Sequence, residues 1–378
     1  MCIKKSTYLL SKVFSLICLV FAQVAFAEEV PRIGPDGTIK VVSFDLPESA
    51  YLSDETRAAL KRYRDVTAKE LVAAFGECPA IDKVSASEAP SARRCRAEAF
   101  YTTNWYKNLV NRYKVKIEAK TIGGVFVEEF TPIEGVASDN NQRILINLHG
   151  GAFISGAVWF GRIESLPVAS LGKFRVVSVD YRQAPDHNFP AASEDVAAVY
   201  RELLKQYKPE NIGFYGCSAG AILTAQSIAW FLEEGLPIPG AAGMNCAGAY
   251  AAIDEKLVKW VRSDSGYLSG AFMGISMEDT YGSLPYFQTA DQTSPLASPG
   301  GHDQILSKFP PTLLTTGTRD YFFSDVVSTH AQLVRLGVEA NLHVWEGMEH
   351  GFIANPELPE SREAYEVITK FFDKHLGR

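Results

Sequence analysis

The sequence has 378 residues, of which 47% are hydrophobic and 21% are charged, proportions typical of a globular protein. It carries no low-complexity or heptad tract, which excludes a disordered or fibrous chain. The net charge of −7 comes without a basic stripe, so we expect no nucleic-acid partner, because phosphate backbones are bound by clustered Lys and Arg.

The first 27 residues have the pattern of a secretory signal peptide. Three lysines precede an apolar run over 13–26, and Ala25-Phe26-Ala27 forms a small-residue cleavage site. The run is shorter than the roughly 20 residues that cross a bilayer. We therefore predict cleavage after Ala27, no stable membrane anchor, and export to the periplasm or the medium. A buried N-terminal helix or an uncleaved anchor is the alternative.

Export changes the interpretation of the cysteines. Cys78 and Cys95 lie 17 positions apart in a polar segment, and in an oxidising compartment this pair is a disulfide candidate. Two free surface thiols are the alternative. Cys217 and Cys246 lie in apolar contexts and are interpreted as buried small hydrophobic residues. No spacing of cysteine or histidine indicates a metal site, and we expect no cofactor.

The segment 28–113 is predicted to be helical. Ser53 is a helix N-cap before an acidic first turn, and a second helix is expected over 93–113. Apolar residues then alternate around Gly123-Gly124, which predicts an antiparallel hairpin.

From residue 114 onward, short apolar runs alternate with helical patterns. Near-continuous apolarity is typical of parallel strands buried on both faces, so the alternation predicts an α/β fold with a mostly parallel central sheet and helices on both faces. The stretch of about 253–311 interrupts this rhythm and is interpreted as a lid or binding loop inserted in a domain spanning 114–378. Strands are expected at 144–148, 176–179, 212–215, 247–250, 312–315 and 342–345, and helices near 194–207, 219–233, 325–336 and 362–375.

The strongest chemical pattern is Gly216-Cys217-Ser218-Ala219-Gly220. It stands between a predicted strand and a predicted helix, the context in which G-x-S-x-G forms the sharp turn that carries a serine nucleophile. We therefore predict that Ser218 is a catalytic nucleophile rather than part of a purely structural turn.

A serine hydroxyl needs a base, and the base needs an acid that orients it. On such a sheet the acid and then the histidine should each follow a later strand. Asp320 follows the strand at 312–315, and His350 follows the strand at 342–345. The predicted triad is therefore Ser218, Asp320 and His350.

Two glycines directly after the strand at 144–148 predict an oxyanion loop. A tetrahedral intermediate needs unobstructed backbone N–H donors, and this loop has the usual position for them. Two amides from Gly150, Gly151 and Ala152, together with that of Ala219, are expected to form the oxyanion hole. His149 is expected to orient the loop rather than to transfer a proton.

Taken together, these motifs resemble those of the hormone-sensitive-lipase-like α/β-hydrolases, the bacterial family IV type of carboxylesterase. The resemblance covers roughly residues 115–375. It implies the α/β-hydrolase fold, hydrolysis of carboxylic esters, and a two-part cap made by N-terminal helices and by an insertion after the strand at 247–250. It rests on the motifs 149–153, 180–185, 189–195, 216–220, 294–296, 317–320 and 349–352.

The chain departs from the family pattern next to the nucleophile. The family usually has Asp where this chain has Cys217, and glycine where it has Ala152 and Ala221. Because a thiol forms only weak hydrogen bonds, the support of the nucleophile turn must differ here. Three aromatic residues at 321–323 replace the usual Pro-Leu and basic residues, and they either reshape the pocket or fill the core.

These features predict a serine carboxylic ester hydrolase that acts through an acyl-enzyme on a small-molecule ester, of short to medium chain length or with an aryl group. The alternatives are a lactonase, an acetyl-sugar deacetylase or a peptidase with the same triad, and a non-catalytic ligand-binding protein of the same fold. The oligomeric state is not predicted.

Overall fold

The computed structural model describes residues 32–41, 45–250, 253–254, 257–258, 263–273, 284–291 and 293–377. The predicted signal peptide, residues 1–27, lies outside these ranges. The chain divides into two units, Met1–Glu48 and Ser49–Arg378, which are described separately. None of the helices in the described ranges is both long enough and apolar enough to span a bilayer.

In the first unit, a short hairpin pairs β1 (Arg32–Ile33) with β2 (Ile39–Lys40) in antiparallel orientation. The Asp36 carboxylate closes its turn by accepting hydrogen bonds from the backbone N–H and the hydroxyl of Thr38. The prediction that the segment 28–113 is helical is therefore wrong for these residues, because glycine, proline and aspartate together favour a turn.

The second unit begins with two nearly continuous helices. The hydroxyl of Ser53 accepts a hydrogen bond from the backbone N–H of Thr56, which confirms the predicted N-cap. Helix α2 (Asp54–Arg62) runs through a π-helical turn (Tyr63–Thr67) into α3 (Ala68–Gly76).

The single helix expected over 93–113 is in fact two helices, α4 (Ala89–Thr102) and α5 (Asn104–Arg112). Thr103 interrupts the helix with an extended backbone, and its hydroxyl accepts the N–H of Tyr106. This arrangement is an N-cap, which starts a new helix in a new direction.

Cys78 and Cys95, the pair identified from the sequence, form a disulfide. It joins the end of α3 to the middle of α4. Closing a loop of 17 residues typically stabilises a fold by about 3 kcal/mol, partly by constraining the unfolded chain. The cross-link therefore fixes two N-terminal helices to each other.

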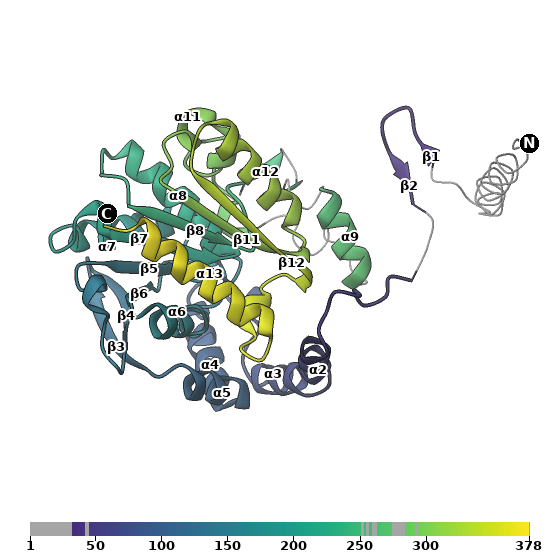
Figure 1. Cartoon of the computed structure of the whole chain (residues 1–378), viewed down its shortest axis with the longest axis horizontal. Coiled ribbons are helices and arrows are strands. Elements are labelled where there is room, and N and C mark those ends of the chain that lie inside the picture. The colour runs from purple at the N-terminus through teal and green to yellow at the C-terminus, as the bar shows by residue number, and fades with distance from the viewer. Residues whose placement is uncertain are drawn as a thin grey trace, which may run out of the picture. The chain divides into compact units, whose positions relative to one another are not determined.

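Eight strands form one sheet in the order β12-β11-β8-β7-β5-β6-β4-β3 (Figure 1). The six strands from β12 to β6 are parallel, whereas β4 and β3 are antiparallel and form the predicted hairpin. The predicted mostly parallel sheet is confirmed. The strands are β3 (Val115–Ile122), β4 (Val125–Pro132), β5 (Ile144–Leu148), β6 (Arg175–Val179), β7 (Ile212–Cys217), β8 (Ala241–Asn245), β11 (Thr312–Arg319) and β12 (Ala340–Glu349).

Helices cover both faces of the sheet, as predicted (Figure 1). The side chains of β5 show this directly, because Ile146 belongs to one core cluster and its neighbour Leu145 belongs to the other. Burial on both faces explains the near-continuous apolar runs of the sequence. Buried residues of three helices belong to the same cluster as Ile146, namely α7 (Ala191–Leu203), α8 (Ala219–Glu233) and α12 (Phe323–Arg335). Buried residues of α6 (Trp159–Gly172), α13 (Pro359–His375) and the N-terminal helices belong to the cluster of Leu145.

The prediction of a strand at 247–250 is wrong. The strand at this position in the sheet is β8, and 247–250 form the loop that follows it. An Ala- and Gly-rich run has weak strand propensity, but this position requires small residues. A Cβ atom added to Gly243 would lie 3.3 Å from the ring of Phe372 in α13.

The predicted cap insertion, 253–311, is described only in part. Its described residues include the antiparallel pair β9 (Ile253–Asp254) and β10 (Leu257–Val258), helix α9 (Asp264–Met273) and the short helix α11 (Asp303–Leu306). The residues of this stretch outside the described ranges carry no structural account. Short 3-10 turns occupy Ile81–Lys83, Ser138–Asn140, Pro209–Asn211, Pro285–Phe287, Pro299–Gly301 and Phe352–Ala354.

Candidate active site

Ser218 occupies a sharp turn between β7 and α8. Its φ of 58° and ψ of −121° are rare for a residue with a side chain, and the turn is possible because glycines flank it. A Cβ atom would lie 2.1 Å from the Leu148 carbonyl oxygen if added to Gly216, and 1.7 Å from it if added to Gly220. The pattern of the sequence is therefore a packing requirement that exposes the serine hydroxyl above the sheet.

The structure brings the three predicted triad residues together. The Ser218 hydroxyl lies 2.9 Å from His350 Nε2, and His350 Nδ1 lies 2.8 Å from Asp320 Oδ1. Because a carboxylate can only accept, the Nδ1–H donates to Asp320 and Nε2 is left to accept the serine proton. The three side chains follow β7, β12 and β11, whose carboxyl ends meet at one edge of the sheet.

The Asp320 side chain is fully buried, whereas 17% of the His350 side chain is exposed. Asp320 also accepts hydrogen bonds from the Thr316 hydroxyl (3.1 Å) and the backbone N–H of Phe322 (2.9 Å). These bonds hold the carboxylate in the orientation that the imidazole needs.

The aromatic residues that replace the family pattern after Asp320 pack against the imidazole. The ring of Tyr321 stacks on His350 at a centroid distance of 4.1 Å, and the ring of Phe322 lies 5.4 Å away. Tyr321 lines the cavity and Phe322 is buried. Both roles considered from the sequence, pocket wall and core filling, are therefore present.

The oxyanion loop follows β5, as predicted, and its backbone is unusual. Gly151, Ala152 and Phe153 have φ values of 125°, 55° and 58°, and a Cβ atom on Gly151 would lie 2.1 Å from the Ser155 carbonyl oxygen. The backbone N–H groups of Gly151, Ala152 and Ala219 donate to no other residue in the described part of the chain.

Gly150 requires a correction to the predicted oxyanion hole. Its backbone N–H donates to Glu164 Oε1 at 2.9 Å, so this amide is already engaged. The donors that remain for a substrate oxyanion are Gly151, Ala152 and Ala219. The sequence analysis missed Glu164, although a lone carboxyl group within an apolar helix is a signal that could have identified it.

His149 lies behind the loop and is almost fully buried. Its Nδ1–H donates to the Gly150 carbonyl oxygen at 2.7 Å, and its ring stacks on Tyr181 at 4.3 Å. Burial lowers the pKa of His149 to about 4, so the ring is neutral at physiological pH. These contacts agree with a role in orienting the loop.

Cys217 and Cys246 are buried free thiols. The hydrogen bond between them, followed by burial, raises the pKa of Cys217 well above that of an ordinary thiol. Both thiols are therefore neutral, and the Cys217 side chain supplies no charge beside the nucleophile.

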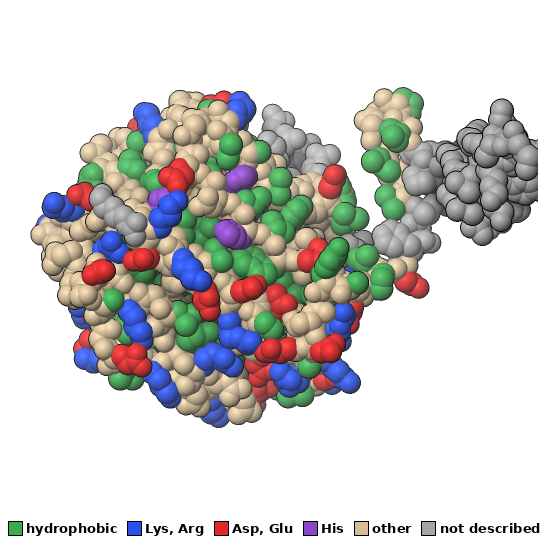
Figure 2. Space-filling model, viewed as in Figure 1, with side chains coloured by type: hydrophobic (Ala, Val, Ile, Leu, Met, Phe, Trp, Pro, Cys, Tyr) green, Lys and Arg blue, Asp and Glu red, His purple; other side chains and the backbone are tan. Residues whose placement is uncertain are grey.

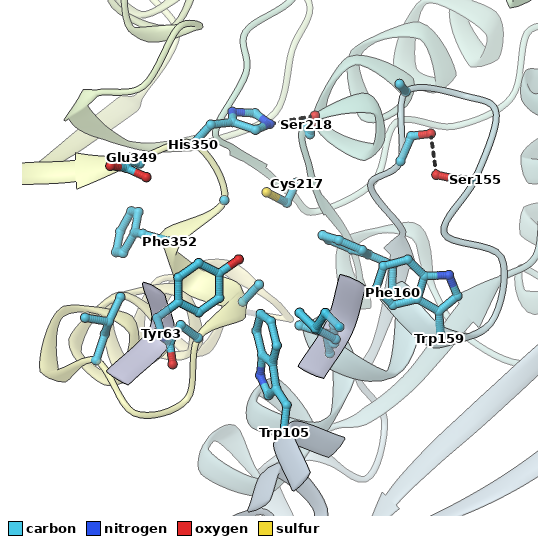
Figure 3. Close-up of a pocket in the computed structure, with 18 of the residues that line it drawn as sticks. Tyr63, Trp105, Ser155, Trp159, Phe160, Cys217, Ser218, Glu349, His350 and Phe352 are labelled. Carbon is cyan, nitrogen blue, oxygen red and sulfur yellow. Dashed lines mark hydrogen bonds between the residues drawn. The ribbon is translucent and has the colours of Figure 1, made fainter. Parts of the chain in front are cut away.

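A cavity of about 530 Å³ opens onto Ser218 and His350, a size typical of small-molecule sites. Figure 3 shows Tyr63 and Trp105 across the cavity from these two residues. Its walls are mainly apolar and aromatic, and they come from the N-terminal helices, the loop before α6 and the segment after His350. The aromatic lining residues are Tyr63, Phe75, Trp105, Trp159, Phe160, Tyr321 and Phe352.

Charge gives no indication of a second kind of site. Figure 2 shows acidic and basic side chains interspersed over the visible face of the second unit. Among the residues that the structure describes, no group of three or more His, Cys, Asp or Glu side chains is arranged to hold a metal ion.

Comparisons with known proteins point to one class of enzyme. A family model for the alpha/beta hydrolase fold matches residues 145–354. An acetyl-hydrolase of Streptomyces hygroscopicus is 30% identical over 62% of this chain and 77% of its own length. Esterase LipU of Mycobacterium tuberculosis is also 30% identical, over 64% of this chain and 80% of its own.

Solved structures of esterases have the same fold. Esterase E25 is 32% identical to this chain, with a TM-score of 0.72 over 89% of this chain and 99% of its own. An esterase from the bacterial hormone-sensitive lipase family is 24% identical, with a TM-score of 0.68 over 86% of this chain and 99% of its own. At that identity the second match shows a shared fold.

Proposed function

This chain belongs to the α/β-hydrolase fold family and is an esterase-type enzyme, and from that premise we propose that it cleaves small carboxylic esters through a triad of Ser218, His350 and Asp320. The family resemblance inferred from the motifs is confirmed by the family model and the esterase relatives. The triad and the choice of substrate are our proposal.

One observation carries the proposal: the continuous hydrogen-bond chain from Ser218 through His350 to Asp320, with distances of 2.9 and 2.8 Å. A nucleophile, its base and the acid that orients the base are the minimum set for acyl transfer by serine. The unengaged amides beside Ser218 add the donors that such a reaction needs.

The residues support the following sequence of steps. Ser218 Oγ attacks the ester carbonyl carbon, and its proton moves to His350 Nε2. The amides of Gly151, Ala152 and Ala219 hold the negative oxygen of the tetrahedral intermediate. The intermediate collapses, and the leaving alcohol takes the proton from Nε2. A water molecule activated by the same nitrogen then hydrolyses the acyl-enzyme and restores Ser218.

The cavity supports an apolar substrate group of limited size. Its aromatic walls favour acyl chains or aryl rings, because each buried methylene contributes about 0.8 kcal/mol. Tyr63 and Trp105 stand opposite the nucleophile (Figure 3), so they set the length of group that fits. We therefore propose esters of short to medium chain length, or with an aryl group, as substrates.

Among p-nitrophenyl esters, kcat/KM should rise or stay level up to about six or eight carbons and fall steeply by about sixteen. Trp105→Ala should raise the rate on dodecanoate relative to butyrate by about 15-fold, since two further buried methylenes contribute about 1.6 kcal/mol. The ratio of the two kcat/KM values is the measurement, because it does not depend on the fraction of active enzyme.

Val72→Ala is the matched control, because Val72 lies on α3 with 73% of its surface exposed and should leave the ratio unchanged. Palmitate turnover equal to that of octanoate would contradict a closed cavity and indicate an open groove. Hydrolysis of lactones, acetylated sugars or peptides with no turnover of simple esters would favour the alternative triad enzymes.

We also propose that the enzyme works in an oxidising compartment after export. The disulfide between Cys78 and Cys95 supports this proposal, because such bonds persist mainly outside the cytosol. Protein isolated from the native host's periplasm or medium should have an intact mass that begins at Glu28, and non-reduced peptide mapping should link the two cysteines. A cytosolic protein that begins at Met1, with both thiols free to be alkylated, would contradict it.

A further inference from the structure

A buried carboxyl group lies directly beneath the oxyanion loop. Glu164, on α6, has only 1% of its surface exposed. Its Oε1 accepts the backbone N–H of Gly150 at 2.9 Å, and its Oε2 accepts the side-chain amide of Asn147 at 2.8 Å.

These contacts hold the start of the loop that carries the predicted oxyanion donors. Gly150 immediately precedes Gly151, whose amide is one of those donors. Because a peptide group is planar, the hydrogen bond from the Gly150 N–H to Glu164 fixes the peptide that joins His149 to Gly150. The hydroxyl of Tyr181 donates to the carbonyl oxygen of the same peptide at 2.7 Å, so this peptide is held from both sides.

The hydrogen bonds extend from Glu164 into the sheet. Asn147 of β5 accepts a hydrogen bond from the Ser178 hydroxyl of β6 at 2.8 Å, so the amide that holds Glu164 is itself held. Burial raises the pKa of Glu164 to about 8, and the hydrogen bonds from Gly150 and Asn147 act in the opposite direction. A buried carboxyl group is costly, and the cost is offset here by hydrogen bonds from neutral groups.

We propose that Glu164 is a positioning residue that holds the start of the oxyanion loop through the Gly150 N–H. The proposal rests on the proposed function, because it concerns the same Ser218. Glu164 touches no reacting atom, so its effect must pass through the placement of the donors.

Glu164→Gln tests the proposal with little change in volume. The new NH₂ group must face either the Gly150 N–H or the Asn147 amide, both of which donate to the carboxyl group now, so the start of the loop should shift relative to α6. Misplacement of catalytic groups by about 1 Å can cost about a hundredfold in rate. We expect kcat for p-nitrophenyl butyrate to fall by about 10- to 100-fold, with KM changed by less than about threefold.

The second readout is the inhibition constant of a trifluoromethyl ketone, which forms a tetrahedral adduct with the serine and places an oxyanion in the hole. Transition-state analogues lose affinity in parallel with kcat/KM when a variant has lost interactions of the transition state. We expect the inhibition constant to rise by the same factor as kcat/KM falls. A role limited to folding would lower the titrated fraction of active enzyme but not kcat per active site.

Asp325→Asn is the matched control. Asp325 is also a buried carboxyl group that accepts a backbone N–H, that of Gly248 at 2.7 Å, and its replacement should keep kcat within about twofold. If Glu164→Gln fails to fold, Asn147→Ala loosens the same carboxyl group from its other oxygen and should give the same pattern, with a loss of about three- to tenfold.

Parallel losses in kcat and in inhibitor affinity at constant KM would support the proposal. Unchanged kcat per active site and unchanged inhibitor affinity in the folded variant would overturn it, while Ser218-dependent esterase activity of the wild type would leave the proposed function standing. The proposed function itself would be contradicted by a different result, namely wild-type turnover that does not require Ser218.

Discussion

Replacing Ser218 with alanine is expected to lower kcat for ester hydrolysis by at least about a thousandfold, because the members of a triad act as a unit. The variant keeps the Cβ atom and the backbone of the turn, so the fold should survive. Initial rates with p-nitrophenyl butyrate, together with the melting temperature, measure the two effects separately.

Ser227→Ala is the control for this prediction. Ser227 lies in α8, the helix that Ser218 precedes, and its hydroxyl donates to the Leu223 carbonyl oxygen at 2.7 Å within the same helix. Its replacement should keep kcat within about twofold. A Ser218→Ala variant that retains more than about a tenth of wild-type turnover would mean that another group is the nucleophile.

Asp320→Asn should have the next largest effect, a fall in kcat of about 10³- to 10⁴-fold with little change in KM. Asparagine can occupy the same buried position, with its one amide oxygen towards the Thr316 hydroxyl and its NH₂ group towards His350. Its amide would favour the wrong tautomer of His350, in which Nε2 carries the proton and can no longer accept one from Ser218.

The measurement is the comparison of kcat and KM between Asp320→Asn and Asp325→Asn, the same substitution five residues along the chain. A fall of less than about tenfold at Asp320 would show that the imidazole is oriented by something else. Equal losses in both variants would indicate a general effect of removing a buried carboxylate.

The proximity of Ser218, His350 and Asp320 could be predicted from the sequence because local patterns and one rule of topology are sufficient. The flanking glycines at 216 and 220 identify the turn, and parallel strands place the residues that follow them at a common edge. Asp320 and His350 could therefore be assigned from their position after two apolar runs, although they lie far from Ser218 in the sequence.

Contacts between distant elements could not be predicted in the same way. The engagement of the Gly150 amide depends on Glu164, which is 14 residues further along on a helix whose orientation the sequence pattern does not fix. The cavity likewise needs Tyr63 and Trp105 from separate helices to meet the segment after His350.

Local misassignments have physical causes as well. The strand β8 was missed because it begins with Ala241, Ala242 and Gly243, and small residues have weak strand propensity. The break at Thr103 was missed because its neighbours continue a helical pattern, while the capping hydrogen bond to Tyr106 depends on the backbone conformation that the fold selects.

The most direct test of a serine triad is covalent labelling of the wild-type protein with a fluorophosphonate, followed by peptide mapping. The account predicts one adduct per chain, on Ser218, with esterase activity lost in proportion to the labelled fraction, and no adduct in Ser218→Ala. Wild-type protein that stays unlabelled while it hydrolyses esters, or an adduct on a different residue that abolishes activity, would contradict it.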